Sequence, residues 1–428
     1  MVNKIWVFLK DNIRYLFLGG YISIEFIRFG GSIDFNQFLF YYLSIVNAVV
    51  CIYILLNIGE YKAKFKLLFS NIFIYMYGGF VIWGLLSYFY AINTSEVLIK
   101  SATWISSFLV FFNIFILFKK EDFKKVAFIL SALLVLEVYS SFSMYWEIIK
   151  YLPYDFSNNS LLRGVTGNRN LTALIFCLKI PFVVYIIKSS KNKYLKLVFY
   201  SILIWVIYTL LLLGSRSSYV YFAVAILISV IYSYLVNKKS LIMFLRDQHL
   251  LYSFIGAFLL FSLFIGNNNS ASIYNRVSSI DFQETSTQTR LRFYSHGINH
   301  IKNNIFKGVG LGNWKIKSIE YDSQNMNSYI VPFYLHNDFL EVGTELGIAG
   351  LLLYLGIFIY ILIKLLLMIL KEINNNGHSF PLYILFLSII VYFVDSNLNF
   401  PHGRAISQVT FNILLAITLL NLLKYEKK

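Results

Sequence analysis

Charged residues, cysteines and prolines are all scarce in this sequence of 428 residues. Only 14% of the residues are charged, whereas 58% are hydrophobic and 19% are aromatic. A soluble protein of this length would carry far more charge. The 5 prolines form no proline-rich linker, and no stretch of the sequence has the composition of a separate soluble domain. These shortages exclude an ordinary soluble protein and favour a chain embedded in a lipid bilayer.

Features of a metal site are also missing. The two cysteines, Cys51 and Cys177, both lie in long apolar runs, so neither a disulfide nor a metal site is expected of them. There is no DxD motif, and no acidic pair with the spacing of metal ligands occurs in the arginine-bearing loops described below. No Ser-His-Asp arrangement can be defended either. We therefore expect a protein that uses neither a metal nor a cofactor.

Long apolar runs recur along the chain, and each approaches the roughly 20 residues that a helix needs to cross a bilayer. They do not alternate apolar and polar residues, as the strands of a transmembrane barrel would. We predict an all-α polytopic membrane protein with about twelve transmembrane helices, near residues 12–28, 37–58, 67–90, 97–118, 125–147, 171–188, 196–213, 217–236, 249–266, 347–370, 380–396 and 405–423. Arg14 and Glu25 interrupt the first of these, which has no cleavage site after it and is expected to be retained.

Lysines cluster in every second predicted loop and at both chain ends. The clusters lie within residues 4–10, 62–66, 119–125, 188–196, 238–246, 364–371 and 424–428. By the positive-inside rule this side, with both termini, is cytoplasmic. Topology thus accounts for the formal net charge of +16, and a nucleic-acid partner is not expected.

The opposite loops carry isolated arginines instead of lysines. These are Arg163, Arg169, Arg216, Arg290, Arg292 and Arg404. Arginine binds phosphate through a planar, bidentate fork and stays charged in any surroundings, so this side favours an anion-binding site. We predict one integral membrane domain, residues 1–428, in which the loop 267–346 between the ninth and tenth spans forms an outer cap and part of the active site. The start of this cap, residues 267–285, is polar and is expected to be a loop.

The only long stretch that is not mostly apolar runs from Thr289 to Gly350. In its first part, apolar residues recur every three or four positions and predict an amphipathic helix: Leu291, Tyr294, Ile298, Ile301 and Ile305. The glycines within residues 308–312 then predict a flexible turn. A second helix is predicted to begin near His336 and to continue into the tenth span.

Each polar residue on the outer side has a structural and a functional interpretation. Arg216, in the turn GSRSS, could extend from a helix end to the interface or hold an anion in an open cavity. Arg290 could belong to an ordinary solvated helix. His336 precedes a predicted helix N-terminus, where the dipole disfavours the imidazolium, and a neutral imidazole suits a general base. It could equally belong to a capping sequence in which Asn337 or Asp338 satisfies the free amides.

Other polar positions leave the same choice open. The turn GVTGNRN, residues 164–170, could cap the sixth span or bind a sugar or phosphate. The turn SNLNFPHGR, residues 396–404, is a further polar outer turn. Lys100 and Glu137 lie within or near spans and are expected to be either paired inside the helix bundle or functional.

Four of these pieces, in this order, resemble the O-antigen ligase and O-antigen polymerase superfamily of bacterial membrane glycosyltransferases. GNRN resembles the GN-x-N of the superfamily at the head of a span, and GSRSS resembles its small-Ser-Arg-small turn. Arg290, Tyr294 and Gly308-Val-Gly310 resemble R-x-x-x-W…P-x-x-G-x-G. HNDFLEVGTELGIAG, from His336, resembles H-N-x-x-L…E-x-G-x-x-G. The resemblance covers roughly residues 164–404, and it departs from the pattern at Tyr294 and Ile305, which replace a tryptophan and a proline.

The resemblance implies a metal-independent glycosyltransferase at the outer face of the bacterial cytoplasmic membrane. Its donor would be a glycan on undecaprenyl pyrophosphate, and its acceptor a hydroxyl of another glycan or lipid-linked unit. Arg216 and Arg290 would clamp the pyrophosphate, and His336 would be the general base. The positions expected to bind substrate are Arg163, Asn168, Arg169, Asn170, Tyr294, Asn337, Glu345, His402 and Arg404.

Several functions remain open at this point. A polymerase would join surface-polysaccharide repeat units of O-antigen or capsule, which we favour slightly. A ligase would pass the finished glycan to lipid A core or another acceptor. A transporter for lipid-linked glycans would also suit arginines in an outer cavity, although inverted repeats and broken helices at mid-membrane are not evident. A scaffold among other polysaccharide-assembly proteins would not need the histidine.

Overall fold

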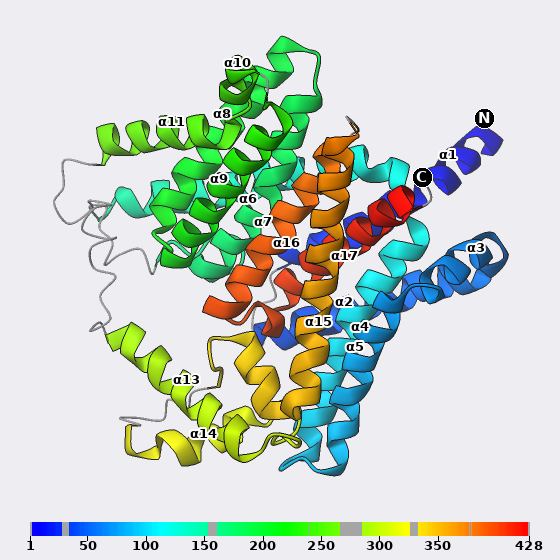
Figure 1. The fold of residues 1–428 in the computed structure, drawn as a ribbon, viewed down its shortest axis with the longest axis vertical. Coiled ribbons are helices and arrows are strands. Elements are labelled where there is room, and N and C mark those ends of the chain that lie inside the picture. Colours follow the sequence, from blue (N-terminus) through cyan, green and yellow to red (C-terminus); the bar gives the residue numbers. More distant parts are fainter. Residues whose placement is uncertain are drawn as a thin grey trace. The chain divides into compact units, whose positions relative to one another are not determined.

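The computed structural model describes residues 2–27, 34–152, 161–238, 240–265, 285–325, 333–375, 377 and 379–426. Every regular element within these ranges is a helix (Figure 1). The prediction of an all-α fold is therefore confirmed. The predicted loop 267–285 lies outside the described residues except for Thr285, where a helix begins.

Ten of the described helical segments are long and apolar enough to cross a membrane. They contain α2 (Phe35–Leu56), α4 (Ile72–Leu86), α5 (Thr94–Leu117), α6 (Phe123–Ile149), α7 (Arg169–Ser189), α8 (Lys193–Leu213), α9 (Arg216–Val236), α15 (Asp338–Asn374), α16 (Phe380–Leu398) and α17 (Ala405–Glu426). Each corresponds to a predicted span. The chain is a polytopic membrane protein.

Two further predicted spans fall in helices, but these helices are too short or too weakly apolar to count among the ten candidate membrane spans. The first predicted span falls in α1 (Val2–Ile22), which contains Lys4, Lys10 and Arg14 and is only weakly apolar. The ninth falls in α11 (His249–Phe264), whose 16 residues extend over only about 24 Å, less than the hydrocarbon core of a bilayer. The predicted count of twelve is therefore not confirmed.

One lysine-rich loop of the prediction is helical in the structure. Residues 59–66 belong to α3 (Ile58–Phe69), in which lysine, alanine and leucine are all good helix formers. As a result α4 begins later than predicted. Asn71 caps it by accepting a hydrogen bond from Phe73 N (2.9 Å).

The described chain divides into two compact units. The first consists of Met1–Lys120, Thr285–Ile361 and Ser396–Lys424. It holds α1 to α5, the cap helices α13 (Thr285–Asn303) and α14 (Trp314–Asp322), the first part of α15, and most of α17. The second consists of Glu121–Glu284, Leu362–Asp395 and Tyr425–Lys428, and α6 to α11 belong to it.

In the second unit, a fully buried ion pair joins two spans. Lys179 of α7 donates to the Glu137 carboxylate of α6. A charge inside a membrane-spanning bundle is costly unless it is paired, so each residue accounts for the presence of the other. Of the two interpretations that the sequence left open for Glu137, the structure thus supports pairing inside the bundle.

Candidate functional site

The predicted amphipathic helix of the cap is α13, but its buried face differs from the predicted stripe. Leu291 and Ile298, which belong to the stripe, are exposed, whereas Gly297 and His300 are buried. A side chain on Gly297 would approach a methyl carbon of Leu335 to 3.0 Å, so the glycine allows the helix to pack closely there. Arg290 lies two turns and Tyr294 one turn before Gly297, on the side of α13 that packs inward.

Two side chains of α13 bind backbone carbonyls on other segments of the first unit. Arg290 Nη1 donates to the carbonyl of Leu398 (3.0 Å), at the end of α16. The Tyr294 hydroxyl donates to the carbonyls of His336 (3.0 Å) and Asn397 (3.3 Å). These hydrogen bonds bring Arg290 and Tyr294 of α13 into one cluster with the turn at His336, which lies 42 residues beyond Tyr294.

His336 lies in a strained turn directly before α15. Its φ of 56° falls in the left-handed region, which is uncommon for any residue other than glycine and is found mainly at asparagine, aspartate and histidine. Its ring packs edge-on against Phe400, with 4.9 Å between the ring centroids. Its Nδ1 atom is buried and bonds to no described residue. One ring nitrogen of His336 thus has no partner in the part of the chain that the structure describes.

Asn337 caps α15, as one of the sequence interpretations proposed. Its side-chain oxygen accepts a hydrogen bond from Leu340 N (3.0 Å), and its amide donates to the Asn397 carbonyl (3.3 Å). The cap leaves His336 outside the helix. Because the cap role belongs to Asn337, the His336 ring is not needed to satisfy the helix N-terminus.

The surroundings of His336 favour the neutral imidazole. Burial is the main cause, and the positive charges of Arg290 and Arg404 add to it, so that the pKa falls from 6.5 to about 4. The sequence argument predicted a neutral ring from the helix dipole, whereas the causes found in the structure are burial and two arginines. At neutral pH the ring can accept a proton.

This lowered pKa predicts the pH dependence of the reaction. A base with a pKa of about 4 stays neutral down to that pH, so kcat/KM is expected to be flat between neutral pH and about 5 and to fall tenfold per pH unit below about 4. Folding stability should decrease as the pH falls from 6.5 towards 4, because the unfolded chain binds the proton more readily. A pH series, with activity re-measured after return to neutral pH, tests both effects. An acid limb near 6.5 would contradict the prediction.

Three carboxylates in the first turns of α15 each accept a hydrogen bond from a backbone amide of another segment. They are Asp338 (from His402 N, 3.1 Å), Glu341 (from Leu335 N, 3.2 Å) and Glu345 (from Trp314 N, 3.1 Å). All three are buried. The start of α15 therefore fixes the turn before His336, the loop before α14 and the turn at His402.

The geometry gives Glu345 a positioning role, and a substitution tests it. Glu345→Ala should leave Trp314 N without a partner in a buried place and destabilise the fold by about 1–3 kcal/mol, while Glu345→Gln, which keeps an acceptor oxygen, should cost less. Thermal unfolding in detergent measures this, with transfer activity recorded in parallel. If Glu345→Gln kept full stability and lost transfer, the carboxylate would instead contact substrate, as the sequence predicted.

The glycines within residues 308–312 make close contacts with other segments, and the sequence, which predicted a flexible turn, gave no sign of these contacts. A side chain on Gly308 would lie 2.1 Å from the backbone of Glu345. Val309 N donates to the Thr344 carbonyl (3.0 Å) and Gly310 N to the Glu345 carbonyl (2.9 Å). The turn is thus packed against α15 just before its kink at Gly347, where φ is 69° and ψ is −168°.

Arg404 and His402 lie in different surroundings, although they are neighbours in sequence. Arg404 Cζ is 4.7 Å from the ring centroid of Phe400, the ring that His336 contacts, so Arg404 belongs to the cluster around His336. The His402 ring packs against Trp104 (4.7 Å between centroids) and Tyr354 (5.3 Å). Burial, with a contribution from Lys100, lowers its pKa well below 6.5. The side chain of His402 is thus part of an aromatic packing cluster.

Lys100 is a basic residue near this cluster that the list of predicted site residues did not include. Its Nζ atom lies 5.9 Å from the ring centroid of Tyr334, which stacks on Phe400 (4.2 Å, 2°). It forms no ion pair within 4.0 Å with any described residue. In the sequence, the only indication of a role for Lys100 was its position inside the end of a predicted span. That position left open whether Lys100 is paired inside the bundle or functional.

In the second unit, the turns GNRN and GSRSS meet. Asn168 caps α7 by accepting hydrogen bonds from Asn170 N (2.9 Å) and Leu171 N (3.2 Å). Asn170 in turn accepts a hydrogen bond from the Ser215 hydroxyl (2.9 Å), and the next residue, Arg216, begins α9. Two motifs that are 45 positions apart are therefore joined next to Arg216. Of the other predicted residues, Arg169 is the first residue of α7, and Arg163 is exposed before it.

A cavity of about 700 Å³ in the second unit contains none of the predicted site residues. It lies between α6, α8 and α11 and is lined by Phe142, Tyr145, Trp146, Ile149, Ser201, Ile204, Trp205, Tyr208, Leu260 and Phe264. Nine of these ten side chains are aromatic or aliphatic. The lining suits a hydrocarbon chain and gives a charged glycan no partner.

Comparison with known proteins identifies a domain over the middle of the chain. Residues 201–355 match the family described as O-antigen ligase. The matched range includes Arg216, Arg290 and His336, but not the turns at 164–170 and 402–404. No curated protein matches the chain. Residues 201–355 thus carry an O-antigen ligase family domain, which supports the superfamily that the sequence resembles.

Proposed function

We propose that the protein transfers a glycan from undecaprenyl pyrophosphate to an acceptor hydroxyl, and that it polymerises surface-polysaccharide repeat units. The observation that carries this proposal is His336, a half-buried imidazole. Its buried Nδ1 atom has no partner among the described residues, and burial and two arginines lower its pKa. The O-antigen ligase family match over residues 201–355 supports a glycosyltransferase-like enzyme in general. Donor, acceptor and direction of transfer are part of the proposal.

In the proposed reaction, His336 accepts the proton of the acceptor hydroxyl. The oxygen attacks the anomeric carbon of the donor sugar, and the bond from that carbon to the diphosphate oxygen breaks. The electron pair of the broken bond leaves with the diphosphate. Arg290 and Arg216 bind the growing negative charge through charge-assisted hydrogen bonds. Because a diphosphate is already a good leaving group, no acid is needed on that side.

The other predicted residues divide into two groups under this proposal. Arg163, Arg169 and Asn170 assist Arg216, with which Asn170 is linked through Ser215. Arg404 assists at His336. Tyr294, Asn337, Glu345, Asn168 and His402 position the surrounding backbone, since each makes its contacts with protein groups of its own unit.

The proposed location is the bacterial cytoplasmic membrane, with both termini in the cytoplasm and the active site outside. The lysine clusters at alternate loops support this orientation. The cap helices α13 and α14 then lie outside, where lipid-linked glycan would be presented. Engineered cysteines test the orientation. They are placed at the two termini and on α14, and their accessibility to a membrane-impermeant reagent is measured.

Reconstituted transfer tests the function. The purified full-length protein in liposomes is mixed with undecaprenyl-pyrophosphate-linked repeat units, and the products are separated on a gel. A ladder of longer lipid-linked glycans supports a polymerase. Release of undecaprenyl pyrophosphate only when lipid A core or another acceptor is added supports the ligase alternative. Movement of the donor across the bilayer without release would support a transporter and overturn the proposal.

A further inference from the structure

The segment between α13 and α14 carries two exposed apolar side chains that the candidate site does not use. Phe306 is 80% exposed and Ile305 is 49% exposed. Lys302 and Lys307, on either side of them, are exposed as well. Exposure of a large aromatic side chain to water is unfavourable. The surroundings of this segment indicate which environment covers the side chain.

Hydrogen bonds attach this segment to the turn between α4 and α5. Ile92 N donates to the Val309 carbonyl (3.2 Å), and Leu311 N donates to the Ser87 hydroxyl (2.9 Å). The helices on both sides of this turn are candidate membrane spans, so the turn marks the place where the chain leaves and re-enters the bilayer. The segment therefore lies at a membrane boundary.

A second pair of hydrogen bonds shows where Ile305 lies relative to the ends of the neighbouring spans. Its carbonyl accepts a hydrogen bond from Ile348 N of α15 (2.8 Å). On the same helix, two residues before Ile348, the carbonyl of Leu346 accepts a hydrogen bond from Trp83 Nε1 (3.1 Å). Trp83 lies about one helical turn, roughly 5 Å, before the end of α4. Ile305 is thus held beside the kink of α15 at Gly347 and near the last turn of α4.

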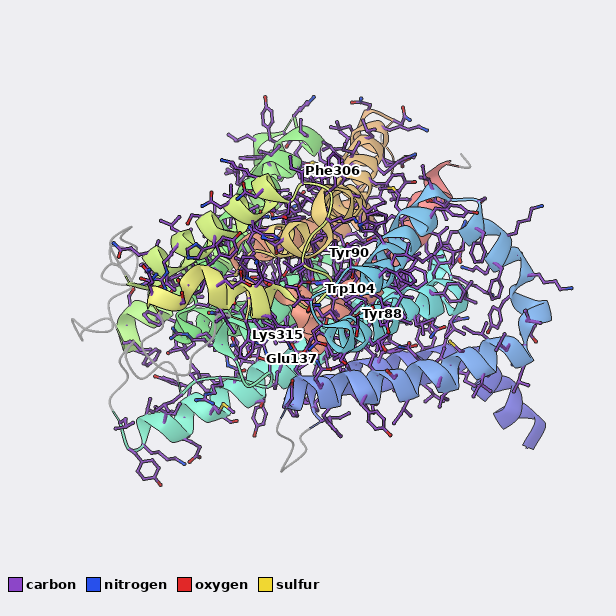
Figure 2. All side chains as sticks on the ribbon, turned by 90° about the horizontal axis from the view of Figure 1, so that it is seen from below. Tyr88, Tyr90, Trp104, Glu137, Phe306 and Lys315 are labelled. Carbon is purple, nitrogen blue, oxygen red and sulfur yellow. The ribbon has the colours of Figure 1, made fainter. Side chains whose placement is uncertain are left out.

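The spans around this point expose apolar side chains of their own. On α15, Leu352 lies one turn beyond Ile348 and is 60% exposed. On α4, Ile82 and Leu86 are exposed. On membrane-spanning helices such side chains face lipid. Figure 2 shows Phe306 beside the ribbon of α15, and the hydrogen bond between Ile305 and Ile348 holds this segment against the part of α15 that exposes Leu352.

We propose that Ile305 and Phe306 form an anchor that inserts into the phospholipid interface and ties the cap to the bilayer. Aromatic side chains are favoured at the headgroup level, and lysines on either side can extend their ammonium groups to the lipid phosphates. The anchored residues directly follow α13 and precede the loop that packs against α15. The anchor therefore fixes the height of α13 at the membrane surface, independently of the reaction that the protein catalyses.

Spin-label accessibility tests the anchor. In a full-length variant without Cys51 and Cys177, a nitroxide is attached through Phe306→Cys, and the protein is reconstituted in palmitoyl-oleoyl phosphatidylglycerol vesicles. Matched labels at Leu352→Cys, on a span, and at Glu320→Cys, on the exposed side of α14, provide the lipid and water references. We expect the label at 306 to collide with oxygen as the label at 352 does, and to lose most of the nickel-chelate collisions seen at 320.

Two results would overturn the anchor. Nickel-chelate access at 306 equal to that at 320 would place the side chain in water. Exclusion of both oxygen and nickel would mean that protein, in place of lipid, covers it. If Phe306→Cys does not fold, Ile305→Cys gives the same comparison at the adjacent position.

Discussion

Replacing His336 by asparagine is expected to lower the rate of glycan transfer by about 10²- to 10⁴-fold, the usual contribution of a general base. Asparagine is the suitable replacement because His336 has a φ of 56°, and asparagine tolerates the left-handed region better than alanine does. The turn before α15 and its cap at Asn337 should therefore persist. Steady-state rates with lipid-linked donor, at equal protein level, measure the loss.

The matched control is His296→Gln on α13. His296 Nε2 lies 3.3 Å from Asp322, in a pair that does not include the residues around His336. Transfer by this variant should stay close to that of the wild type. An active His336→Asn variant would remove the imidazole from the proposed mechanism. Loss of protein or of thermal stability in His336→Asn would show that the turn, instead of the base, had been damaged.

The second large effect is expected at Arg290. Arg290→Lys keeps the positive charge but loses the planar fork, and transfer should fall by about 10- to 10²-fold, the equivalent of one or two charge-assisted hydrogen bonds. Arg290→Gln, which also loses the charge, should cost about 10²- to 10³-fold, as the loss of a transition-state donor does in other enzymes. Both variants remove the bond from Nη1 to the Leu398 carbonyl, so stability must be measured alongside the rate.

Arg292→Lys is the control on the same helix. Arg292 is two residues further along α13, and its Nε lies 2.7 Å from the Asp322 carboxylate. A lysine there can still pair with Asp322, so transfer should change little. Equal losses at 290 and 292 would indicate that both arginines support the fold of the cap and that Arg290 has no special role at the donor diphosphate.

The fold class was predictable because the lipid bilayer imposes it locally. Each span must satisfy its own backbone hydrogen bonds and present apolar side chains over a sufficient length, and both properties can be read from a single run of residues. All ten candidate spans correspond to predicted ones. The two exceptions, α1 and α11, are segments whose charge or length made the local signal weak.

The sequence also determined which residues are candidates for the functional site. The order of GNRN, GSRSS, Arg290 and the segment from His336 indicated the superfamily, and residues 201–355 match the O-antigen ligase family. Capping residues such as Asn168 and Asn337 were equally readable, because a cap depends on the three or four residues that follow it. The functional roles of these residues stay predictions.

Only the tertiary structure decided the environment of each side chain. The apolar stripe of α13 predicted its buried face only in part, since Tyr294 packs against other segments whereas Leu291 and Ile298 are exposed. Exposed apolar side chains are common on protein surfaces, so burial does not follow from hydrophobicity alone. Burial and two arginines from other segments lower the pKa of His336, and the backbone amide of Trp314 donates to Glu345. Charge and hydrogen-bond partners that come from elsewhere in the chain leave no local pattern, and for this reason the sequence could name these residues without giving their contacts.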